Sequence, residues 1–151
     1  MEIGEIYKTR VRLVIFDADG TLTPQRPGSI ASFSFQLLPG VEQRCADLRR
    51  AGVKLAIASN QSRRRQRDFI VQQLRWTQLA IGASAIRWST THRRRKPRPA
   101  MLLELMRKFS CTPEETIFVG DQTTDEEAAR AAGVRFVWSD QFFGFEERRK
   151  Q

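Results

Sequence analysis

Hydrophobic residues recur along the chain in short runs, separated by longer segments in which apolar residues return every three or four positions. The short runs predict buried strands at residues 11–16, 53–58, 116–119 and 134–137. The longer segments have the period of an amphipathic helix and cover residues 40–51, 62–74, 99–109 and 124–132. This alternation predicts an α/β fold of the Rossmann-like kind, with a central parallel sheet between helix layers.

Glycine and proline support the ends of these helices. Gly52 and Gly133 stand where the first and last would end, and Pro99 stands where the third would begin,. Residues 24–39 contain three prolines and a glycine, so a loop or short hairpin is expected there,. A length of 151 residues with 40% hydrophobic residues suits a single domain over residues 1–151,.

The formal net charge of +9 is spread unevenly. Eleven basic residues and one acid, Asp68, lie between Asn60 and Arg98. Such a stretch attracts phosphorylated metabolites or a nucleic-acid backbone, although a solvated basic face has the same composition. Cys45 and Cys111 stand alone, which disfavours a disulfide framework or a zinc site,. The first sixteen residues contain no stretch long enough for a signal peptide or a membrane span, so we expect a soluble cytoplasmic protein with no membrane association.

Two carboxylates follow the first predicted strand, at Asp17 and Asp19, and Gly20 then permits a sharp turn,. Acids at this spacing suit Mg2+ binding together with a division of labour. One acts as nucleophile and metal ligand, while the other donates and accepts a proton. A simple turn with aspartate hydrogen bonds is the alternative.

Polar residues also follow the second strand and precede the third helix. Ser59 and Asn60 offer a hydroxyl and an amide next to free backbone N–H groups, an arrangement that binds phosphate; simple helix capping is the alternative,. Lys96 lies between Arg95 and a proline, which presents its ammonium from a stiff support,. An ammonium so fixed can neutralise phosphate oxygens, although one more surface cation is the plain alternative.

Gly120 and Asp121 follow the 116–119 strand, and Asp125 stands four residues after Asp121. Together they can complete a magnesium shell, Asp121 directly and Asp125 indirectly. Alternatively, Thr123 and Glu126 form a capping box and Asp125 only complements the helix dipole. Since ligands gather outside the carboxyl ends of parallel strands, we expect all these groups to meet at one edge of the sheet.

In this order the residues resemble the four motifs of the haloacid dehalogenase superfamily. The matching segments are DADGT at Asp17–Thr21, then Ser59, Lys96, and GDQTTD at Gly120–Asp125. The resemblance implies a phosphatase that forms a transient aspartyl-phosphate on Asp17, with Asp19 handling the proton and Thr21 supporting the loop. It further implies that Ser59 and Lys96 hold the phosphoryl group, and the neighbouring Asn60 is also expected to bind substrate. Asp17, the Asp19 backbone carbonyl and Asp121 would ligate Mg2+, and Asp125 would orient Lys96 or metal-bound water.

The segments SNQS and RKPRPAM are most similar to subfamily IIIA, which includes histidinol-phosphate, heptose-bisphosphate and polynucleotide 3'-phosphatases. Arg95 occupies the place of a substrate-contacting basic residue in the sugar-phosphate branch. Residues 86–96 contain no cysteine, so the zinc-stabilised loop of many relatives is missing, and His92 is expected to be structural,. Neither 24–39 nor the span from Leu74 to Lys96 has room for a cap domain, so an open site is expected.

Three functional readings remain open from the sequence. The first is a phosphatase of a small metabolite such as a sugar phosphate. The second is a 3'-phosphatase of DNA or RNA ends, motivated by the basic stretch and by Trp76 and Trp88, which can stack on bases if exposed. The third is a capless, tetrameric sugar-acid phosphatase, or a binding module that keeps the fold without activity. The oligomeric state and the roles of Phe142, Phe143 and Phe145 are left open.

Overall fold

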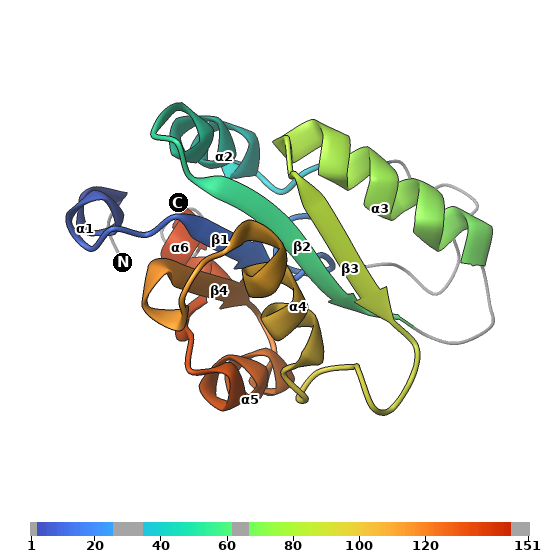
Figure 1. Ribbon diagram of the computed structural model, residues 1–151. Helices are drawn as coiled ribbons and strands as arrows, with labels where there is room; N and C mark the ends of the chain where they lie inside the picture. The colour runs from blue at the N-terminus through green and yellow to red at the C-terminus, as the bar shows by residue number, and fades with distance from the viewer. Residues whose placement is uncertain (1–2, 26–34, 62–66, 146–151) are drawn as a thin grey trace.

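The computed structural model describes residues 3–25, 35–61 and 67–145 (Figure 1). They form five strands: β1 (Leu13–Phe16), β2 (Lys54–Asn60), β3 (Ala85–Ser89), β4 (Thr116–Gly120) and β5 (Arg135–Trp138). The helices are α1 (Ile3–Lys8), α2 (Val41–Arg50), α3 (Arg67–Ile81), α4 (Ala100–Phe109), α5 (Thr123–Ala132) and α6 (Ser139–Phe143), with a 3-10 turn η1 (Pro113–Glu115) before β4.

The five strands form one parallel sheet in the order β3-β2-β1-β4-β5. β1 lies at its centre, where Phe16 is in register with Ile57 of β2 and Val119 of β4. The three strands that carry the predicted site residues are therefore neighbours, and their carboxyl ends lie at one edge. The predicted Rossmann-like α/β class is confirmed.

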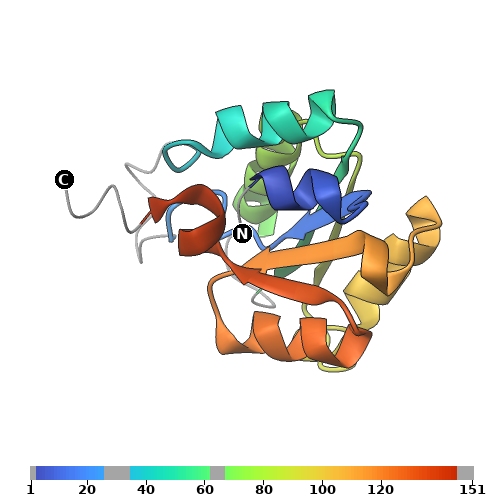
Figure 2. The same cartoon turned by 90° about the vertical axis from the view of Figure 1, so that its left-hand side faces the viewer.

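Helices cover both faces of the sheet, as Figure 2 shows. Successive residues of a strand point to opposite faces, and β1 divides accordingly: Val14 and Phe16 belong to one apolar cluster, Leu13 and Ile15 to the other. The first cluster includes side chains of α2, α3 and α6, and the second those of α4 and α5. Every residue of β1 is buried, as expected for a strand covered on both faces,.

The two faces are packed differently. On the α4 and α5 side, the apolar cluster contains five alanines of the sheet and of α5 (Ala56, Ala58, Ala85, Ala128 and Ala129). On the other side, Phe16 contacts Phe142 and Phe143 of α6 at ring-centroid distances of 5.7 and 5.8 Å. Phe142, Phe143 and Phe145 are all buried, which answers the question left open for them: they pack inward.

Most predicted elements are present, with ends shifted by one or two residues. Three further helical segments, α1, η1 and α6, were not predicted, and neither was the edge strand β3, which lies between Leu74 and Lys96. The predicted end of the 62–74 helix is wrong, because α3 continues to Ile81. Its predicted start at Ser62, most of the 24–39 loop and the last six residues of the chain lie outside the described residues.

Ser59 and Asn60 are the last two residues of β2. They extend the predicted strand of residues 53–58 rather than opening a helix. Pro99 is the cap of α4 rather than its first residue. No helix in the described ranges combines the length and apolarity that crossing a bilayer requires.

Candidate active site

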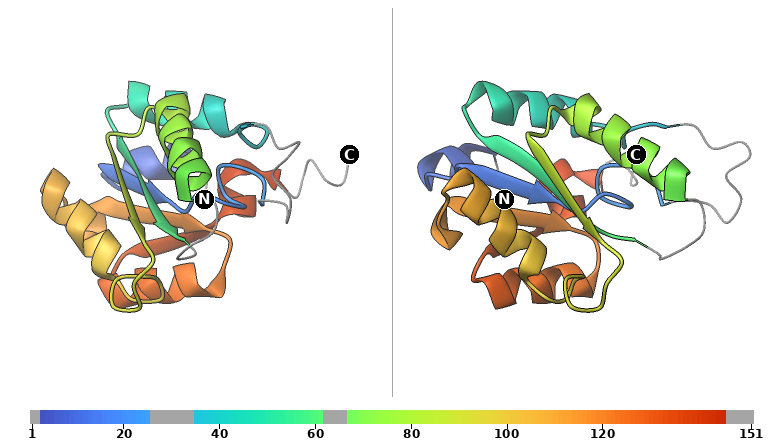
Figure 3. Two further views of the ribbon diagram at one scale, coloured as in Figure 1. Left: turned by 90° about the vertical axis from the view of Figure 1, so that its right-hand side faces the viewer. Right: turned by 45° about the vertical axis from the view of Figure 1, so that its right-hand side comes forward.

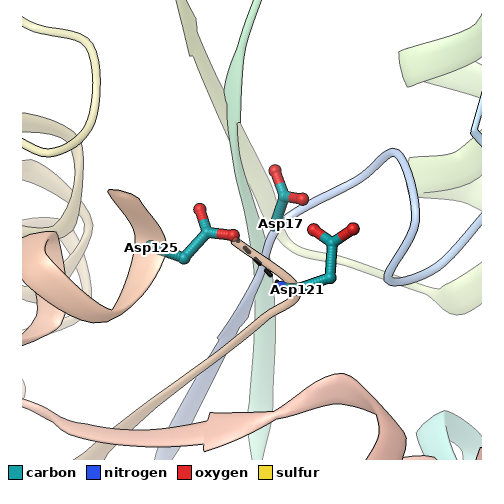
Figure 4. A group of neighbouring side chains, drawn as sticks. All are labelled: Asp17, Asp121 and Asp125. Carbon is teal, nitrogen blue, oxygen red and sulfur yellow. Dashed lines mark hydrogen bonds between the residues drawn. The ribbon is translucent and has the colours of Figure 1, made fainter. Parts of the chain in front are cut away.

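Three aspartates from separate segments meet at the carboxyl edge of the sheet. Asp17 follows β1, Asp121 follows β4, and Asp125 lies in the first turn of α5. One oxygen of each carboxylate lies within 4.8 Å of those of the other two, and Figure 4 shows the three side chains around a common space. Asp17 and Asp125 are buried, and Asp121 is half-buried.

Lys96 brings an ammonium group into this cluster and is 3% exposed. Its Nζ donates to Asp17 Oδ1 at 2.7 Å and to the carbonyl of Ala58 at 2.9 Å. It also pairs with Asp125 Oδ1 at 2.7 Å. An ammonium has three N–H donors, so each has an acceptor. Lys96 is thus a buried, fully bonded link between the carboxylates of Asp17 and Asp125, unlike a surface cation.

The loop that carries Lys96 is held at two points. The Asn60 side chain donates to the Lys96 carbonyl at 2.9 Å and accepts from the Lys96 N–H at 2.8 Å. Farther back, Arg94 donates to both oxygens of Glu104 on α4, at 3.2 and 2.6 Å. Figure 3 shows this loop, residues 90–99, passing from β3 toward the start of α5. Asn60 therefore fixes the backbone from which Lys96 reaches the aspartates.

Asp125 uses both of its carboxylate oxygens within the protein. Oδ1 faces Lys96, whereas Oδ2 accepts the backbone N–H groups of Asp121 at 3.2 Å and Gln122 at 3.1 Å; the first of these is the dashed line in Figure 4. The capping box of α5 is formed by Gln122 and Asp125. The predicted alternative, a box of Thr123 and Glu126, is wrong, because the helix begins one residue earlier than expected.

Asp121 is bonded on one oxygen and unsatisfied on the other. Its Oδ2 accepts from Gln25 Nε2 at 3.0 Å. Its Oδ1 is buried and has no hydrogen-bond partner among the described residues. A buried carboxylate oxygen without a partner is costly, and a hard cation such as Mg2+ satisfies it. The donor set therefore fits Mg2+, with Asp17 and Asp121 as the carboxylates that have capacity to ligate.

The electrostatics of the cluster also favour a cation. Burial raises the pKa of Asp17 to about 8; the Lys96 ammonium opposes this rise and Asp125 adds to it,. Burial raises the pKa of Asp121 as well. For Lys96 burial alone would lower the pKa, but Asp17 and Asp125 outweigh it and raise the pKa. Ionisation of all three carboxylates beside one ammonium would leave two negative charges uncompensated, which one divalent cation would balance.

A cavity of about 210 Å³, here called the phosphoryl cavity, opens in front of this cluster. It is lined by Asp17, Asp19, Gln25, Asn60, Lys96, Gln122, Thr124 and Asp125. Every one of these residues is polar, and the half-buried Asp19 stands in the same wall as Asp17. The cavity can thus hold a small polar group next to both acids of the DADGT segment.

Besides Asp121, which lines a different cavity, three predicted site residues do not line this one. Ser59 is 1% exposed, and its hydroxyl accepts from Gln61 Nε2 at 2.5 Å. The Thr21 hydroxyl is buried and has no hydrogen-bond partner within the described part of the chain. Arg95 is half-buried and lies outside the lining. The substrate contacts expected of Ser59 and Arg95 stay predictions, and His92 is exposed.

Gln25 and Gln122 are site residues that sequence reasoning missed. Gln25 lies in a proline-rich segment with no hydrophobic period, so nothing in the sequence pointed to Asp121 as its partner. Gln122 stands inside the GDQTTD segment, where the rule that favours threonine over glutamine at a helix cap drew attention to Thr123 instead.

Similarity to known proteins agrees with this arrangement. The profile of the haloacid dehalogenase-like hydrolases matches residues 32–139. Phosphoglycolate phosphatase of Pseudomonas putida is 38% identical over 102 residues, which cover 66% of this chain and 35% of that protein. The chain thus spans about a third of the length of this relative. The D-glycero-beta-D-manno-heptose-1,7-bisphosphate 7-phosphatase of Neisseria meningitidis is 30% identical over 138 residues, 82% of this chain and 74% of that protein.

Solved structures share the fold. A heptose bisphosphate phosphatase from B. bronchiseptica, complexed with magnesium and phosphate, superposes with a TM-score of 0.65 at 24% identity over 83% of this chain and 79% of that one. A cobalt-bound deoxy-D-mannose-octulosonate 8-phosphate phosphatase from Haemophilus influenzae gives 0.64 at 21% identity, over 84% and 68%. By the profile that spans most of its length and by its similarity to the heptose enzyme, this chain belongs to the haloacid dehalogenase-like hydrolases.

Proposed function

We propose that this chain is a magnesium-dependent phosphomonoesterase that acts on a small phosphorylated metabolite such as a sugar phosphate. The observation that carries the proposal is the position of Asp17. Its carboxylate lies at the point where Lys96, Asp121 and Asp125 meet, and it lines an all-polar cavity. The relatives named for phosphoglycolate and heptose bisphosphate support the same chemistry.

The proposed reaction has two steps. The Asp17 oxygen that does not bond Lys96 attacks the phosphorus atom, the ester P–O bond breaks, and Asp19 gives its proton to the departing alkoxide. Asp19 then takes a proton from water, whose oxygen attacks phosphorus and releases inorganic phosphate from Asp17. Both acids line the phosphoryl cavity, so both are within reach of one bound group.

Asp17, Asp121 and the backbone carbonyl of Asp19 are proposed to hold Mg2+, which supplies positive charge to phosphate oxygens as negative charge shifts during transfer. Lys96 keeps one Asp17 oxygen fixed and adds a second positive charge beside it,. Asp125 is proposed as a positioning residue, since both of its oxygens already bond the protein.

The test is turnover of p-nitrophenyl phosphate and of a phosphometabolite panel with Mg2+. Asp17→Asn should lower kcat by at least about a thousandfold, because it removes the nucleophile. Asp68→Asn, an exposed acid on α3, is the matched control and should leave kcat unchanged. Unfolding curves should show that both variants stay folded. Full activity in Asp17→Asn would exclude the proposed nucleophile.

The 3'-phosphatase alternative stays a prediction. Arg63, Arg64 and Arg65 lie outside the described residues. Trp88 packs against the apolar core, and the Arg67 guanidinium lies 5.7 Å from its ring centroid. Trp76 lies 5.8 Å from the Phe35 ring. Each indole thus already has a neighbour from within the chain, and the relatives are named for small phosphorylated metabolites, so the small-metabolite proposal is preferred. The tetrameric alternative also stays a prediction.

A further inference from the structure

Gln25 contacts a predicted metal ligand from a distant part of the chain. Its side-chain Nε2 donates to Asp121 Oδ2 at 3.0 Å, although 96 residues separate the two in sequence. Gln25 also lines both the phosphoryl cavity and a second, larger cavity of about 570 Å³, and Asp121 lines the larger one. The hydrogen bond between Gln25 and Asp121 therefore lies at the residue that the two cavities share.

The carboxylate of Asp121 needs a contact that fixes its orientation. One oxygen each of Asp17 and Asp125 lies within 4.8 Å of an Asp121 oxygen, and carboxylates this close repel one another when they are ionised. The larger cavity, which Asp121 also lines, has room for the carboxylate to turn into. Because the terminal torsion of an aspartate side chain is broad, a hydrogen bond is the means by which one orientation is kept.

The hydrogen bond gives the two oxygens of Asp121 different tasks. Oδ2 accepts from Gln25, while Gln122 Nε2 lies 3.5 Å from the same oxygen, at the limit of a hydrogen bond,. Oδ1 is buried and has no hydrogen-bond partner in the part of the chain that the structure describes. An amide is a neutral donor, so Asp121 keeps its negative charge and Oδ1 stays available to a cation.

The turn after β1 makes room for this contact. Gly20 has a φ of +82°, and a Cβ at this position would collide with both the Gln25 amide and the Asp121 carboxylate. The Gly20 N–H donates to the Thr23 carbonyl at 2.7 Å, which closes the turn. Pro24 follows with a fixed φ, so Gln25 extends from a stiff support. The glycine of the DADGT segment and the Gln25 contact therefore belong to one arrangement.

We propose that Gln25 is a positioning residue of the metal site, which holds Asp121 so that its Oδ1 can ligate Mg2+. The inference rests on the proposed magnesium-dependent function, and it adds a residue that lies outside the four motif segments. Replacing a partner that orients a metal ligand typically lowers metal affinity by about 10–100-fold. Because Gln25 itself is exposed, its replacement should weaken the binding of the cation without unfolding the chain.

Calorimetric titration of Mg2+ into the whole chain tests the proposal without turnover. Gln25→Met keeps the length of the side chain and removes the N–H donor. Gln72→Met makes the same change at an exposed position of α3, outside the lining of both cavities. Gln25→Met should raise the Kd for Mg2+ by at least about tenfold, and Gln72→Met should leave it at the wild-type value. Equal Mg2+ affinities in the two variants overturn the proposal.

Two further measurements distinguish positioning from a general structural role. In EDTA, Gln25→Met and Gln72→Met should unfold at the same urea concentration; a Gln25→Met chain that is unfolded under the titration conditions overturns the proposal. Saturating Mg2+ should return kcat of Gln25→Met for p-nitrophenyl phosphate to near the wild-type value, because the cation itself then holds Asp121. A kcat that stays low at saturating Mg2+ would place Gln25 on the substrate instead and would also overturn the proposal.

Mg2+ binding by the wild-type chain separates the two levels of failure. If wild type and Gln25→Met bind Mg2+ equally, the inference falls and the proposed function stands. If wild type binds Mg2+ but turns over no phosphomonoester, the proposed phosphatase function falls, and the titration still decides the role of Gln25. If wild type binds no Mg2+, both fall.

Discussion

Replacing Asp125 by asparagine tests how the cluster is held together. Asp125 is 1% exposed and pairs with Lys96 at 2.7 Å. Removing one partner of a buried ion pair costs about 3–5 kcal/mol. Lys96 keeps Asp17 and a carbonyl as acceptors, and the asparagine oxygen can still accept a backbone N–H. We therefore expect a loss near the lower limit, about 3 kcal/mol of unfolding free energy.

Urea denaturation followed by tryptophan fluorescence measures this loss, since the chain has three tryptophans. A loss of about 3 kcal/mol corresponds to a fall in Tm of roughly 6–12 °C for a chain of this size. Glu126→Gln is the control on the same helix. Its pair with Arg130 is 4.0 Å long and largely exposed, so a change below about 0.5 kcal/mol is expected.

The outcome for Asp125→Asn also decides its role. A variant as stable as wild type would refute the reasoning, because it would show that neither the ion pair nor the two N–H contacts stabilises the fold. A stable variant with weakened Mg2+ binding would assign Asp125 to the metal rather than to Lys96 and the Asp121 loop.

Three further changes have defined outcomes. Gly20→Ala should cost more than about 1 kcal/mol in urea denaturation and weaken Mg2+ binding, because φ is +82° and the new Cβ would collide with the Asp121 carboxylate,. Because the pKa of Asp17 is raised to about 8, the metal-free chain should lose stability as pH rises from about 4 toward 8,. Below pH 8, Mg2+ must displace that proton, so its affinity, measured by calorimetry, should rise up to about tenfold per pH unit; Asp17→Asn should abolish both trends. Glu104→Gln removes the charge that holds Arg94 and should lower kcat/KM for p-nitrophenyl phosphate by roughly tenfold,. The unfolding free energy should change by less than about 1 kcal/mol. Unchanged kinetics would show that the loop carrying Lys96 does not need the contact between Arg94 and Glu104.

The hydrophobic pattern was sufficient for the centre of the sheet and for the edge strand β5, but it failed at the other edge, β3. β1 and β4 are continuous apolar runs because helices cover both of their faces,. β3 lies at the end of the sheet and contains Arg87, whose guanidinium lies 3.5 Å from Glu104. The ion pair that accommodates Arg87 in this strand is a tertiary contact, and the local sequence pattern does not reveal such a contact.

The extension of α3 beyond Leu74 had a readable signal. Buried positions continue with helical spacing through Thr77 to Ile81. Thr77 is polar, but its hydroxyl donates to the carbonyl of Gln73 at 2.8 Å, four residues earlier, which allows it to be buried,. Counting threonine as a possible core residue would have placed the helix end correctly.

The candidate site also has a part that the local sequence pattern predicts and a part that depends on tertiary contacts. Asp17, Lys96 and Asp121 follow or precede elements that periodicity identifies, so strand order alone brings them to one edge. The partners that orient them, Gln25 and Asn60, act through contacts across 96 and 36 residues of sequence. The amide of Asn60 is bonded to the Lys96 backbone at both ends. Asn60 also lines the phosphoryl cavity, and its predicted contact with substrate stays a prediction.

Asp17 and Asp125 are far apart in sequence, so the carboxylate cluster forms only when distant parts of the chain have folded together. No fragment that lacks β1 or α5 can form it, so a cation at this site would bind the folded protein and not such a fragment. Free Mg2+ at a hundred times its dissociation constant would then add about 2.7 kcal/mol to unfolding free energy. Bound Mg2+ would thus link the residue after β1 to the last third of the protein and stabilise the folded state.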